Sequence, residues 1–208
     1  MLVSIAGTEH TVYANVICET IQQSALVRGT GIAIRTPEYI LTKIISGNAV
    51  IAIDDGQFAG FCYIETWDHG EYVVHSGLIV HPIYRYQGLA LRLKQSIFMH
   101  SRQKYPKAKI FGITTGLAVM KINSSLGYQP VTFSSLTTDS EFWDGCSSCK
   151  NYAILQSNDR SMCLCTGMLY DPSDIKNNKL YTLKTAVWMR LQAIKKKVFI
   201  KHSSKEKK

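Results

Sequence analysis

The sequence predicts an α/β (α+β) fold in which a mixed, mostly antiparallel central sheet is flanked by helices. Apolar residues recur with helical spacing over residues 13–28 and 37–45. The period changes to that of β-strands between residues 48 and 80. Helix and strand patterns then alternate over residues 88–134. The expected order is therefore two helices, a meander, a helix, a strand, a helix and a strand.

The two N-terminal helices are marked by their ends as well as by their period. Gly29 and Gly31 supply a stop signal after the first segment. Thr36 can cap the second helix, Pro37 suits its first turn, and Gly47 follows its apolar stripe. Two short helices in succession often frame a cleft, so we expect a cleft beside them.

Three extended segments form the predicted meander. Residues 49–53 are apolar, and the hairpin signal Asp54-Asp55-Gly56 leads into residues 58–66. The third run, residues 71–80, is rich in β-branched residues and ends at His81-Pro82. The later elements are expected as a helix over 88–102, a strand over 109–115, a helix over 117–126 and a strand over 128–134.

The formal net charge of +9 comes from the C-terminal end of the chain. Residues 176–208 contain eleven of the 24 Lys and Arg residues and one of the 15 Asp and Glu residues, which leaves 13 basic and 14 acidic side chains in residues 1–175. A solvated terminus is the more frequent outcome of such a tail than RNA or lipid binding. We expect no nucleic-acid partner and no membrane span, because no apolar run approaches about 18 residues.

The N-terminus has no basic start, and its apolar stretch stops before Glu9 and His10. We therefore expect no secretory signal and a cytoplasmic location. Cytoplasmic reductants keep thiols reduced, so the six cysteines are not expected to form a disulfide framework. Their spacing is informative about metal binding or chemistry instead.

The segment from Val80 to Ala90 carries the clearest chemical signal. A strand that ends in Val80-x-Pro82 is followed by Arg85-x-x-Gly88-x-Ala90, which opens a helix. Free backbone N–H groups and a positive helix terminus gather there and favour an anion. Gly88 lets the backbone approach a phosphate, and Ala90 keeps the first turn clear of bulk. We expect a pyrophosphate at this point.

These residues resemble the signature of the GNAT superfamily of acyl-CoA-dependent N-acyltransferases, Arg/Gln-x-x-Gly-x-Gly/Ala at a strand-to-helix junction. The element order over residues 13–134 and the late helix ending Asn123-Ser124-Ser125-Leu126-Gly127-Tyr128 are also similar to the family. The resemblance implies the GNAT fold, with acetyl-CoA as co-substrate. It implies that the cofactor is held by Ile79, Val80, Arg85, Tyr86, Gln87, Gly88, Leu89, Ala90 and Asn123.

The chain is expected to have three parts. Residues 1–135 would form the GNAT acetyl-CoA-binding domain, and residues 136–175 a Cys-rich extension. Residues 176–208 would form a basic C-terminal helix and tail.

The resemblance also suggests the chemistry. In the family, the backbone amide near Val80 donates a hydrogen bond to the thioester carbonyl and stabilises the oxyanion. Amide formation further needs a base, and the candidates are His75, Glu65 and Glu71. We assign the role to His75, five residues before Val80, because an unperturbed pKa of about 6.5 suits it. The alternative is that His75 points into the core or to the opposite face of the sheet.

One position departs from the family. Many members carry a tyrosine four residues before the late glycine, where it protonates the departing thiolate. Counting back from Gly127 gives Asn123. Water or another tyrosine would then supply the proton, and Asn123 would bond the pantetheine arm. This departure keeps open a sensor that binds acyl-CoA without turnover.

Four cysteines form two close pairs, Cys146-x-x-Cys149 and Cys163-x-Cys165. A turn and a strand can each aim two thiolates at one point, so a structural zinc ion is one expectation. The second pair has one intervening residue where the common spacing has two. Four reduced thiols packed in a small subdomain are therefore the other expectation.

The expected function is transfer of an acetyl group from acetyl-CoA to the amine of a small molecule. The extension from Phe142 to Pro172 is similar to one in bacterial GNAT proteins, some linked to arginine biosynthesis, which points to an amino acid such as glutamate. Arg28 or Arg35 could meet a substrate carboxylate, or each is a solvated charge. A non-catalytic sensor and an acetyltransferase delivered to RNA by the basic tail are the alternatives, and a homodimer stays open.

Overall fold

The computed structural model of the chain describes residues 1–28 and 32–177. The chain divides into two compact units, Met1–Tyr170 and Asp171–Lys208. In the second unit the structure describes α7 (Pro172–Asn177). The helix predicted after residue 178 and the basic tail lie outside the described residues.

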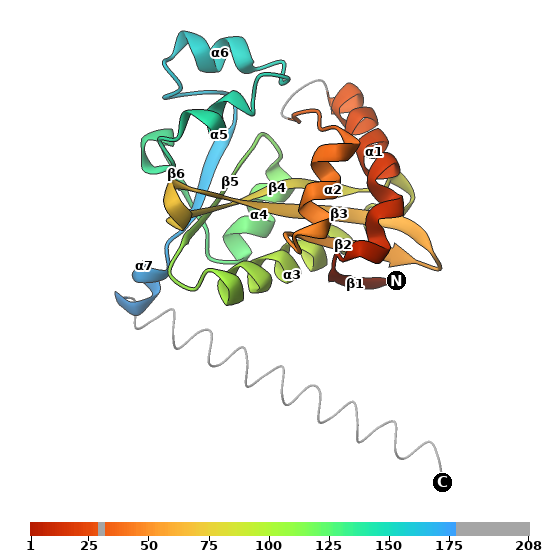
Figure 1. Cartoon of the computed structure of the whole chain (residues 1–208). Helices are drawn as coiled ribbons and strands as arrows, with labels where there is room; N and C mark the ends of the chain where they lie inside the picture. The colour runs from red at the N-terminus through yellow and green to blue at the C-terminus, as the bar shows by residue number, and fades with distance from the viewer. Residues whose placement is uncertain (29–31, 178–208) are drawn as a thin grey trace. The chain divides into compact units, whose positions relative to one another are not determined.

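The first unit contains a sheet with the strand order β1-β2-β3-β4-β5-β7-β6 (Figure 1). Neighbouring strands are antiparallel, except for the parallel pair β4 and β5. The strands are β1 (Leu2–Ile5), β2 (Ala49–Asp54), β3 (Gln57–Trp67), β4 (Tyr72–Val80), β5 (Lys109–Thr114), β6 (Gln129–Val131) and β7 (Thr166–Tyr170). The predicted mixed, mostly antiparallel sheet is thereby confirmed.

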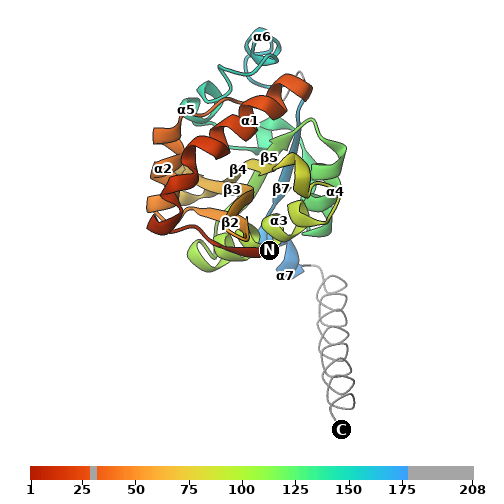
Figure 2. The ribbon, with the colours of Figure 1, turned by 90° about the vertical axis from the view of Figure 1, so that its right-hand side faces the viewer.

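Helices cover both faces of this sheet. Figure 2 shows α1 and α2 on one side of it and α3 and α4 on the other. The helices of this unit are α1 (Ala14–Arg28), α2 (Pro37–Ile45), α3 (Leu89–Lys104), α4 (Leu117–Ser125), α5 (Ser140–Asp144) and α6 (Tyr152–Ser157). Short 3-10 segments occupy Thr8–Tyr13, Asp68–Gly70, Pro82–Tyr84 and Phe133–Ser135.

Local sequence signals explain where two of these helices begin. The Thr36 side chain accepts a hydrogen bond from the Tyr39 N–H at 3.3 Å, and Pro37 opens the first turn of α2, as predicted. Gly88 precedes α3 in a left-handed conformation with φ of 76°. The apolar residues Leu89, Leu93 and Ile97 are buried on that helix, which was predicted over residues 88–102.

The face of the sheet under α1 and α2 carries the main apolar core. Ile17 and Ile21 of α1 and Ile40 and Ile44 of α2 are fully or almost fully buried against β2 and β3. Burying each such side chain contributes roughly 1.5–3 kcal/mol. This packing fixes the positions of α1 and α2 against the sheet.

The fold does not divide at residue 135, the predicted end of the acetyl-CoA-binding domain. Strand β7 comes from the predicted Cys-rich extension, yet it lies between β5 and β6 and pairs with both. A second apolar core joins Trp67 and Phe111 to Phe142 and Trp143 of α5. The extension up to Tyr170 therefore belongs to the first unit, because a paired strand and a shared core tie it to the sheet.

Two further elements differ from the sequence prediction. Strand β1 was not predicted, and its residues pair with Val50–Ile53 at the edge of the sheet. The strand predicted over 128–134 is shortened to Gln129–Val131 because Phe133–Ser135 turns into a 3-10 segment.

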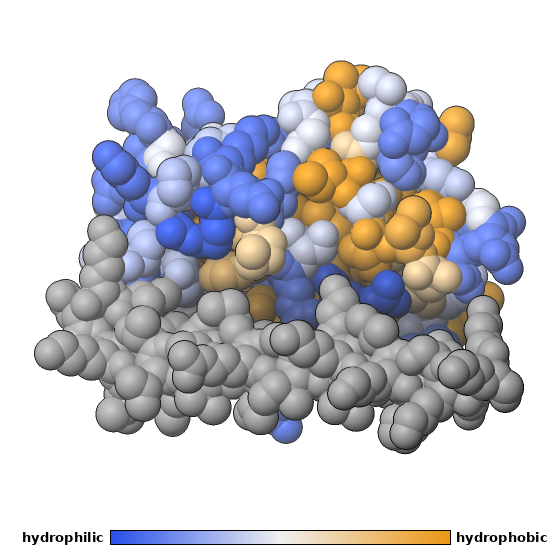
Figure 3. Space-filling model, turned by 90° about the horizontal axis from the view of Figure 1, so that it is seen from below, coloured by the Kyte–Doolittle hydropathy of each residue, from blue (hydrophilic) through white to orange (hydrophobic). Residues whose placement is uncertain are grey.

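The surface of the first unit is not evenly polar. Seen from below, the visible left-hand part is mostly hydrophilic, whereas hydrophobic residues gather on the right among scattered hydrophilic ones (Figure 3). Single exposed apolar side chains such as Val12 and Val27 are normal on protein surfaces.

Within the described residues, no helix combines the length and the apolar character that a membrane span needs.

Candidate active site

The site begins where β4 and β5 separate. The two strands pair from Tyr72↔Lys109 to Val74↔Phe111. Strand β4 continues to Val80, and the described residues show no further pair between it and β5. A cavity of about 550 Å³ lies at this opening. It is lined by residues of β3, β4, β5 and α4 and by residues 32–36, which precede α2.

A β-bulge shapes β4 at the edge of this cavity. Phe61 pairs with Ile79, but Tyr63 pairs with Ser76, so β4 holds one more residue than β3 there. Gly77 absorbs the extra residue with φ of 62°. A Cβ atom on Gly77 would overlap the ring of Tyr63, so glycine is required for both conformation and space.

The bulge and the ladder orient backbone amides toward the opening. The His81 N–H donates to the Ala59 carbonyl at 2.9 Å, so the neighbouring Val80 N–H points away from β3. By the same alternation, the Leu78 N–H points to the open edge. Leu78 and Ile79 line the cavity, and Val80 is not among the lining residues. The oxyanion role predicted for the Val80 amide is therefore shared with a second candidate, Leu78.

The predicted phosphate loop has the expected backbone. Tyr86 and Gly88 both have positive φ, 63° and 76°. In the described part of the chain, the N–H groups of Gln87, Gly88, Leu89 and Ala90 have no protein acceptor. No atom of the described residues lies within 4 Å of the place where a Cβ of Gly88 would be. An anion can therefore approach the start of α3 and accept these hydrogen bonds.

Arg85 lies in this loop, but its guanidinium is directed toward the end of β4 and toward α1. Its Nε donates to the Val80 carbonyl at 3.1 Å, and its Nη2 donates to the Ser24 hydroxyl of α1 at 2.9 Å. These bonds tie the loop to the end of β4 and to α1. The predicted contact with phosphate is not made by these two nitrogens, because both are engaged within the protein.

Asn123 of α4 lines the cavity and is 1% exposed. Its Oδ1 is buried and has no hydrogen-bond partner within the described residues. A buried acceptor without a donor costs about 1–3 kcal/mol. A ligand N–H in the cavity would satisfy it, as the predicted pantetheine contact requires.

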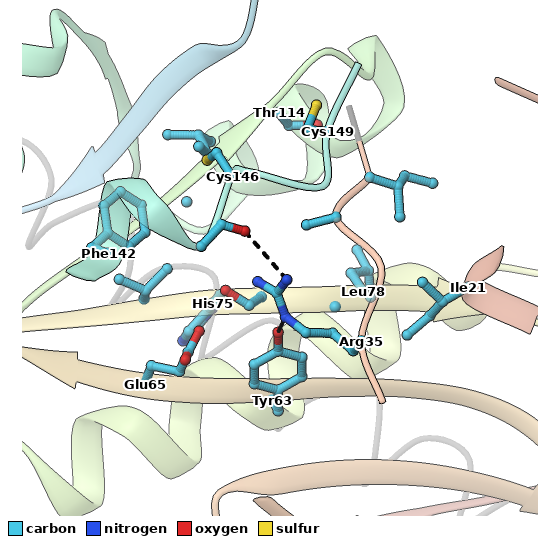
Figure 4. Close-up of a pocket in the computed structure, with 18 of the residues that line it drawn as sticks. Ile21, Arg35, Tyr63, Glu65, His75, Leu78, Thr114, Phe142, Cys146 and Cys149 are labelled. Atoms are coloured by element: carbon cyan, nitrogen blue, oxygen red, sulfur yellow. Dashed lines mark hydrogen bonds between the residues drawn. The ribbon is translucent and has the colours of Figure 1, made fainter. Parts of the chain in front are cut away.

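The far wall of the cavity is built around Arg35, which follows the α1 helix in the chain. The guanidinium donates from Nε to the Tyr63 hydroxyl at 3.0 Å and from Nη1 to the Gly145 carbonyl at 3.3 Å (Figure 4). Among the described residues Nη2 has no acceptor. Arg28 is the last residue of α1, and its side chain lies outside the described residues.

Glu65 is the carboxylate of this wall. Its Oε1 accepts hydrogen bonds from the Tyr39 hydroxyl and, at 3.4 Å, from the Lys43 ammonium. Burial, together with Tyr63 and Glu65, raises the pKa of Tyr39, so the phenol stays protonated and remains a donor. Glu71, by contrast, is exposed and pairs with Lys109 at 3.6 Å. Glu65 and not Glu71 therefore faces the cavity.

His75 is held in a buried network on the α3 side of the sheet. Its Nε2 lies 2.9 Å from the Ser101 hydroxyl, and its Nδ1 lies 3.0 Å from both Lys94 Nζ and the Tyr128 hydroxyl. Burial, followed by the charges of Lys94 and His100, holds the pKa of His75 well below its ordinary value. The geometry does not support His75 as the base, because both ring nitrogens are already engaged.

Lys94 is the residue of this network that the sequence prediction missed. It is 2% exposed and lines the same cavity. A signal was present in the sequence, since Lys94 lies on the buried face of α3 with Leu93, Ile97 and Ser101. A lysine is almost never fully buried unless it is paired, so its place in an apolar stripe called for a buried partner.

The four cysteines of the two predicted pairs gather around one small cavity. Burial, then the neighbouring thiols, raises the pKa of Cys146 to about 11 and of Cys165 to about 12. Within the described residues, no group of three or more His, Cys, Asp or Glu side chains is arranged to hold a metal ion. The zinc prediction is therefore not supported, and Cys146, Cys163 and Cys165 pack against the apolar core of the extension.

Comparisons with known proteins show the fold. No model of a protein family matches the sequence, and no curated protein matches it either. N-acetylglutamate synthase from Neisseria gonorrhoeae, complexed with coenzyme A and N-acetyl-glutamate, has a TM-score of 0.58 at 15% identity, over 82% of this chain and 34% of that one. This chain thus spans about a third of that enzyme.

Two other solved structures are similar over most of their own length. Diaminobutyrate acetyltransferase EctA from Paenibacillus lautus, with its substrate and coenzyme A, has a TM-score of 0.55 at 10% identity, over 82% of this chain and 94% of that one. A GNAT superfamily phosphinothricin acetyltransferase from Sinorhizobium meliloti has a TM-score of 0.55 at 14% identity, over 82% and 87%. The chain therefore has the fold of the GNAT acetyltransferases, as predicted.

Proposed function

We propose that the protein is an N-acetyltransferase that moves the acetyl group of acetyl-CoA to the amine of a small molecule. The observation that carries the proposal is the opening between β4 and β5, with its cavity and the free N–H groups at the start of α3. Pyrophosphate would lie on the N–H groups of Gln87 to Ala90. The pantetheine arm would then run along the open edge of β4 and meet Asn123.

The thioester would lie at the bulge. The N–H groups of Leu78 and Val80 point to the open edge and would stabilise the tetrahedral oxyanion. Glu65 would accept the proton of the attacking amine, because its side chain lines the cavity and its Oε2 has no partner within the described residues. In this arrangement Glu65, and not His75, is the base.

The acceptor is proposed to be an amino acid. Arg35 offers its Nη2 on the cavity wall, where a substrate carboxylate would form a charge-assisted hydrogen bond. Glu65 lies on the same wall and would face the amine. Two of the proteins with this fold were solved with amino-acid ligands, N-acetyl-glutamate and diaminobutyric acid.

Titration calorimetry with acetyl-CoA tests the donor site. The wild-type protein is expected to bind, and Gly88→Trp is expected to abolish binding because the indole would fill the phosphate position. Gly56→Trp is the matched control, since Gly56 has the same φ of 76° and the same open space but lies in the β2–β3 turn. Equal binding by both variants and the wild type would refute the loop assignment.

Thiol release in a screen of amino acids and polyamines tests the reaction. Release with one amine and not with others supports the enzyme and identifies the acceptor. Tight acetyl-CoA binding without release by any amine would support the sensor instead, for which the asparagine at position 123 is the structural argument. Delivery to RNA by the basic tail concerns residues outside the described structure, and salt-dependent RNA binding that is lost on truncation after Asn178 would indicate it.

A further inference from the structure

The structure contains a buried cation beside the proposed thioester site. Lys94 extends from α3 to the base of the cavity, with Nζ 3.0 Å from His75 Nδ1 and 5.2 Å from the centre of the Tyr128 ring. Both Lys94 and His75 line the cavity. The side chain therefore reaches the place where β4 separates from β5.

Hydrogen bonds around His75 determine which ring nitrogen carries the proton and which one accepts hydrogen bonds from its neighbours. The Ser101 hydroxyl donates to the Ile97 carbonyl at 2.8 Å, so it accepts a hydrogen bond from His75 Nε2–H. Nδ1 of the neutral ring then has one lone pair. Two donors, Lys94 Nζ and the Tyr128 hydroxyl, each lie 3.0 Å from Nδ1 and compete for that lone pair. Since one lone pair accepts one hydrogen bond, either Lys94 Nζ or the Tyr128 hydroxyl lacks an acceptor at Nδ1.

The charge of Lys94 also lacks a counter-charge in the part of the chain that the structure describes. Within the described residues, no Asp or Glu lies at ion-pair distance from Nζ. The titratable groups packed around it are Cys62 of β3, His75 of β4 and Tyr128. Burial raises the pKa of Cys62 to about 11 and that of Tyr128 well above 10, so both are neutral at physiological pH, as is His75. An anion in the cavity would complement this ammonium.

We propose that Lys94 is the catalytic acid that protonates the departing thiolate of coenzyme A. Many members of the family use for this step a tyrosine at the position that Asn123 occupies here. This role depends on the proposed function. In the step, the substrate nitrogen forms the new C–N bond and the C–S bond breaks, with its electron pair leaving on sulfur. The nitrogen proton passes to Glu65, and a Lys94 proton passes to the sulfur. Solvent returns the proton from Glu65 to Lys94, so a neutral amine reacts with no net proton change.

The energetics of this proton transfer are favourable. Burial lowers the pKa of Lys94 to about 8, although nearby Cys62 opposes the shift. A thiol has a pKa of about 8.5, so the proton moves between two groups of similar acidity. An ordinary surface lysine would hold its proton about 100-fold more tightly.

Ionisation of bound coenzyme A tests the proposal without relying on turnover. The ultraviolet absorbance of the thiolate is followed against pH for coenzyme A bound to the wild type, to Lys94→Met and to the control Lys104→Met, which removes an exposed lysine from the same helix. We expect the bound thiol pKa to lie at least about one unit below that of free coenzyme A in the wild type and the control. In Lys94→Met it should return to the free value.

Thiol release in single turnovers, with the acceptor found by the screen, is the second measurement. Lys94→Met should slow it about 100-fold or more while coenzyme A affinity is kept. Lys94→Arg keeps the charge but should not restore the rate at neutral pH, because a guanidinium holds its proton. Binding with an unshifted thiol pKa in the wild type, or full activity of Lys94→Met, would overturn the Lys94 role alone. A wild type that does not bind coenzyme A would overturn the proposed function together with it.

Discussion

The guanidinium of Arg35 donates a hydrogen bond of 3.3 Å to the carbonyl of Gly145, a residue 110 positions later in the chain. A second bond, from the Ile34 N–H to the Ser148 hydroxyl at 3.0 Å, joins the same two segments. The turn that carries Cys146 and Cys149 therefore holds Ile34 and Arg35, just before α2. The extension thus forms part of the wall of the proposed acceptor site.

Replacing Arg35 should affect the acceptor more than the donor. Arg35→Met removes Nη2, the proposed donor to the acceptor carboxylate, together with the bonds that hold the guanidinium to Tyr63 and Gly145, and a hydrogen bond to a charged group is worth about 1.5–3 kcal/mol. We expect KM for the amino-acid acceptor to rise at least about tenfold. Kd for acetyl-CoA should stay the same. Steady-state kinetics and calorimetry separate the two constants.

The control for this variant is Arg160→Met. Arg160 forms an exposed ion pair with Asp144 at 2.7 Å, and such pairs contribute roughly 0–1 kcal/mol. An unchanged KM for the acceptor in both variants would show that Arg35 has a structural role and does not bind the acceptor.

The bulge at Gly77 can be tested against a glycine of the same conformation. Gly77→Ala places a Cβ against the ring of Tyr63 at φ of 62°, whereas Gly47→Ala meets nothing within 4 Å at φ of 63°. A left-handed alanine costs about 1–2 kcal/mol, and overpacking adds about 1–3 kcal/mol. Urea unfolding should therefore show a larger loss for Gly77→Ala, with loss of acetyl transfer. Equal losses of unfolding free energy in the two variants would mean that the bulge accommodates the Cβ atom without overpacking.

Asn123→Leu separates ligand binding from stability. Leucine has the same branched shape, although it is bulkier, and it removes the unpaired Oδ1 beside an open cavity, so the free energy of unfolding should be unchanged or higher. Binding of acetyl-CoA should weaken about tenfold, which corresponds to one lost hydrogen bond. Thermal unfolding and calorimetry on the same sample measure both effects. Undiminished affinity would exclude Asn123 from the pantetheine site.

Lys94 should make stability depend on pH above neutrality. Its pKa is about 8 in the folded protein and about 10.4 when unfolded, so the unfolded chain binds more protons between these values. Folding therefore carries a penalty of up to about 3 kcal/mol below pH 8, which is relieved as the pH rises toward 10. The free energy of unfolding of Lys94→Met relative to wild type should be highest at pH 7 and should decline above pH 8. Urea titrations at both ends of this range measure the difference, and a constant difference would contradict the shift.

The sequence by itself determined the elements whose signals are local. The cap at Thr36 and the turn glycine at Gly56 depend on a few neighbouring residues, so their positions were predictable. The loop from Arg85 to Ala90 was predictable for the same reason, because free N–H groups at a helix start follow from backbone geometry. These signals sufficed for the fold class and for the proposed donor site.

Only the tertiary structure decided what depends on residues far apart in the chain. Strand β1 is short and half exposed, and it forms only because β2 offers an edge. Insertion of β7 between β5 and β6 has no local signal either. The same is true of the site: long-range packing brings Lys94, His75 and Tyr128 together, and burial by that packing shifts their pKa values. Spacing in a sequence indicates which residue types are available, whereas desolvation and hydrogen-bond partners decide which of them can transfer a proton.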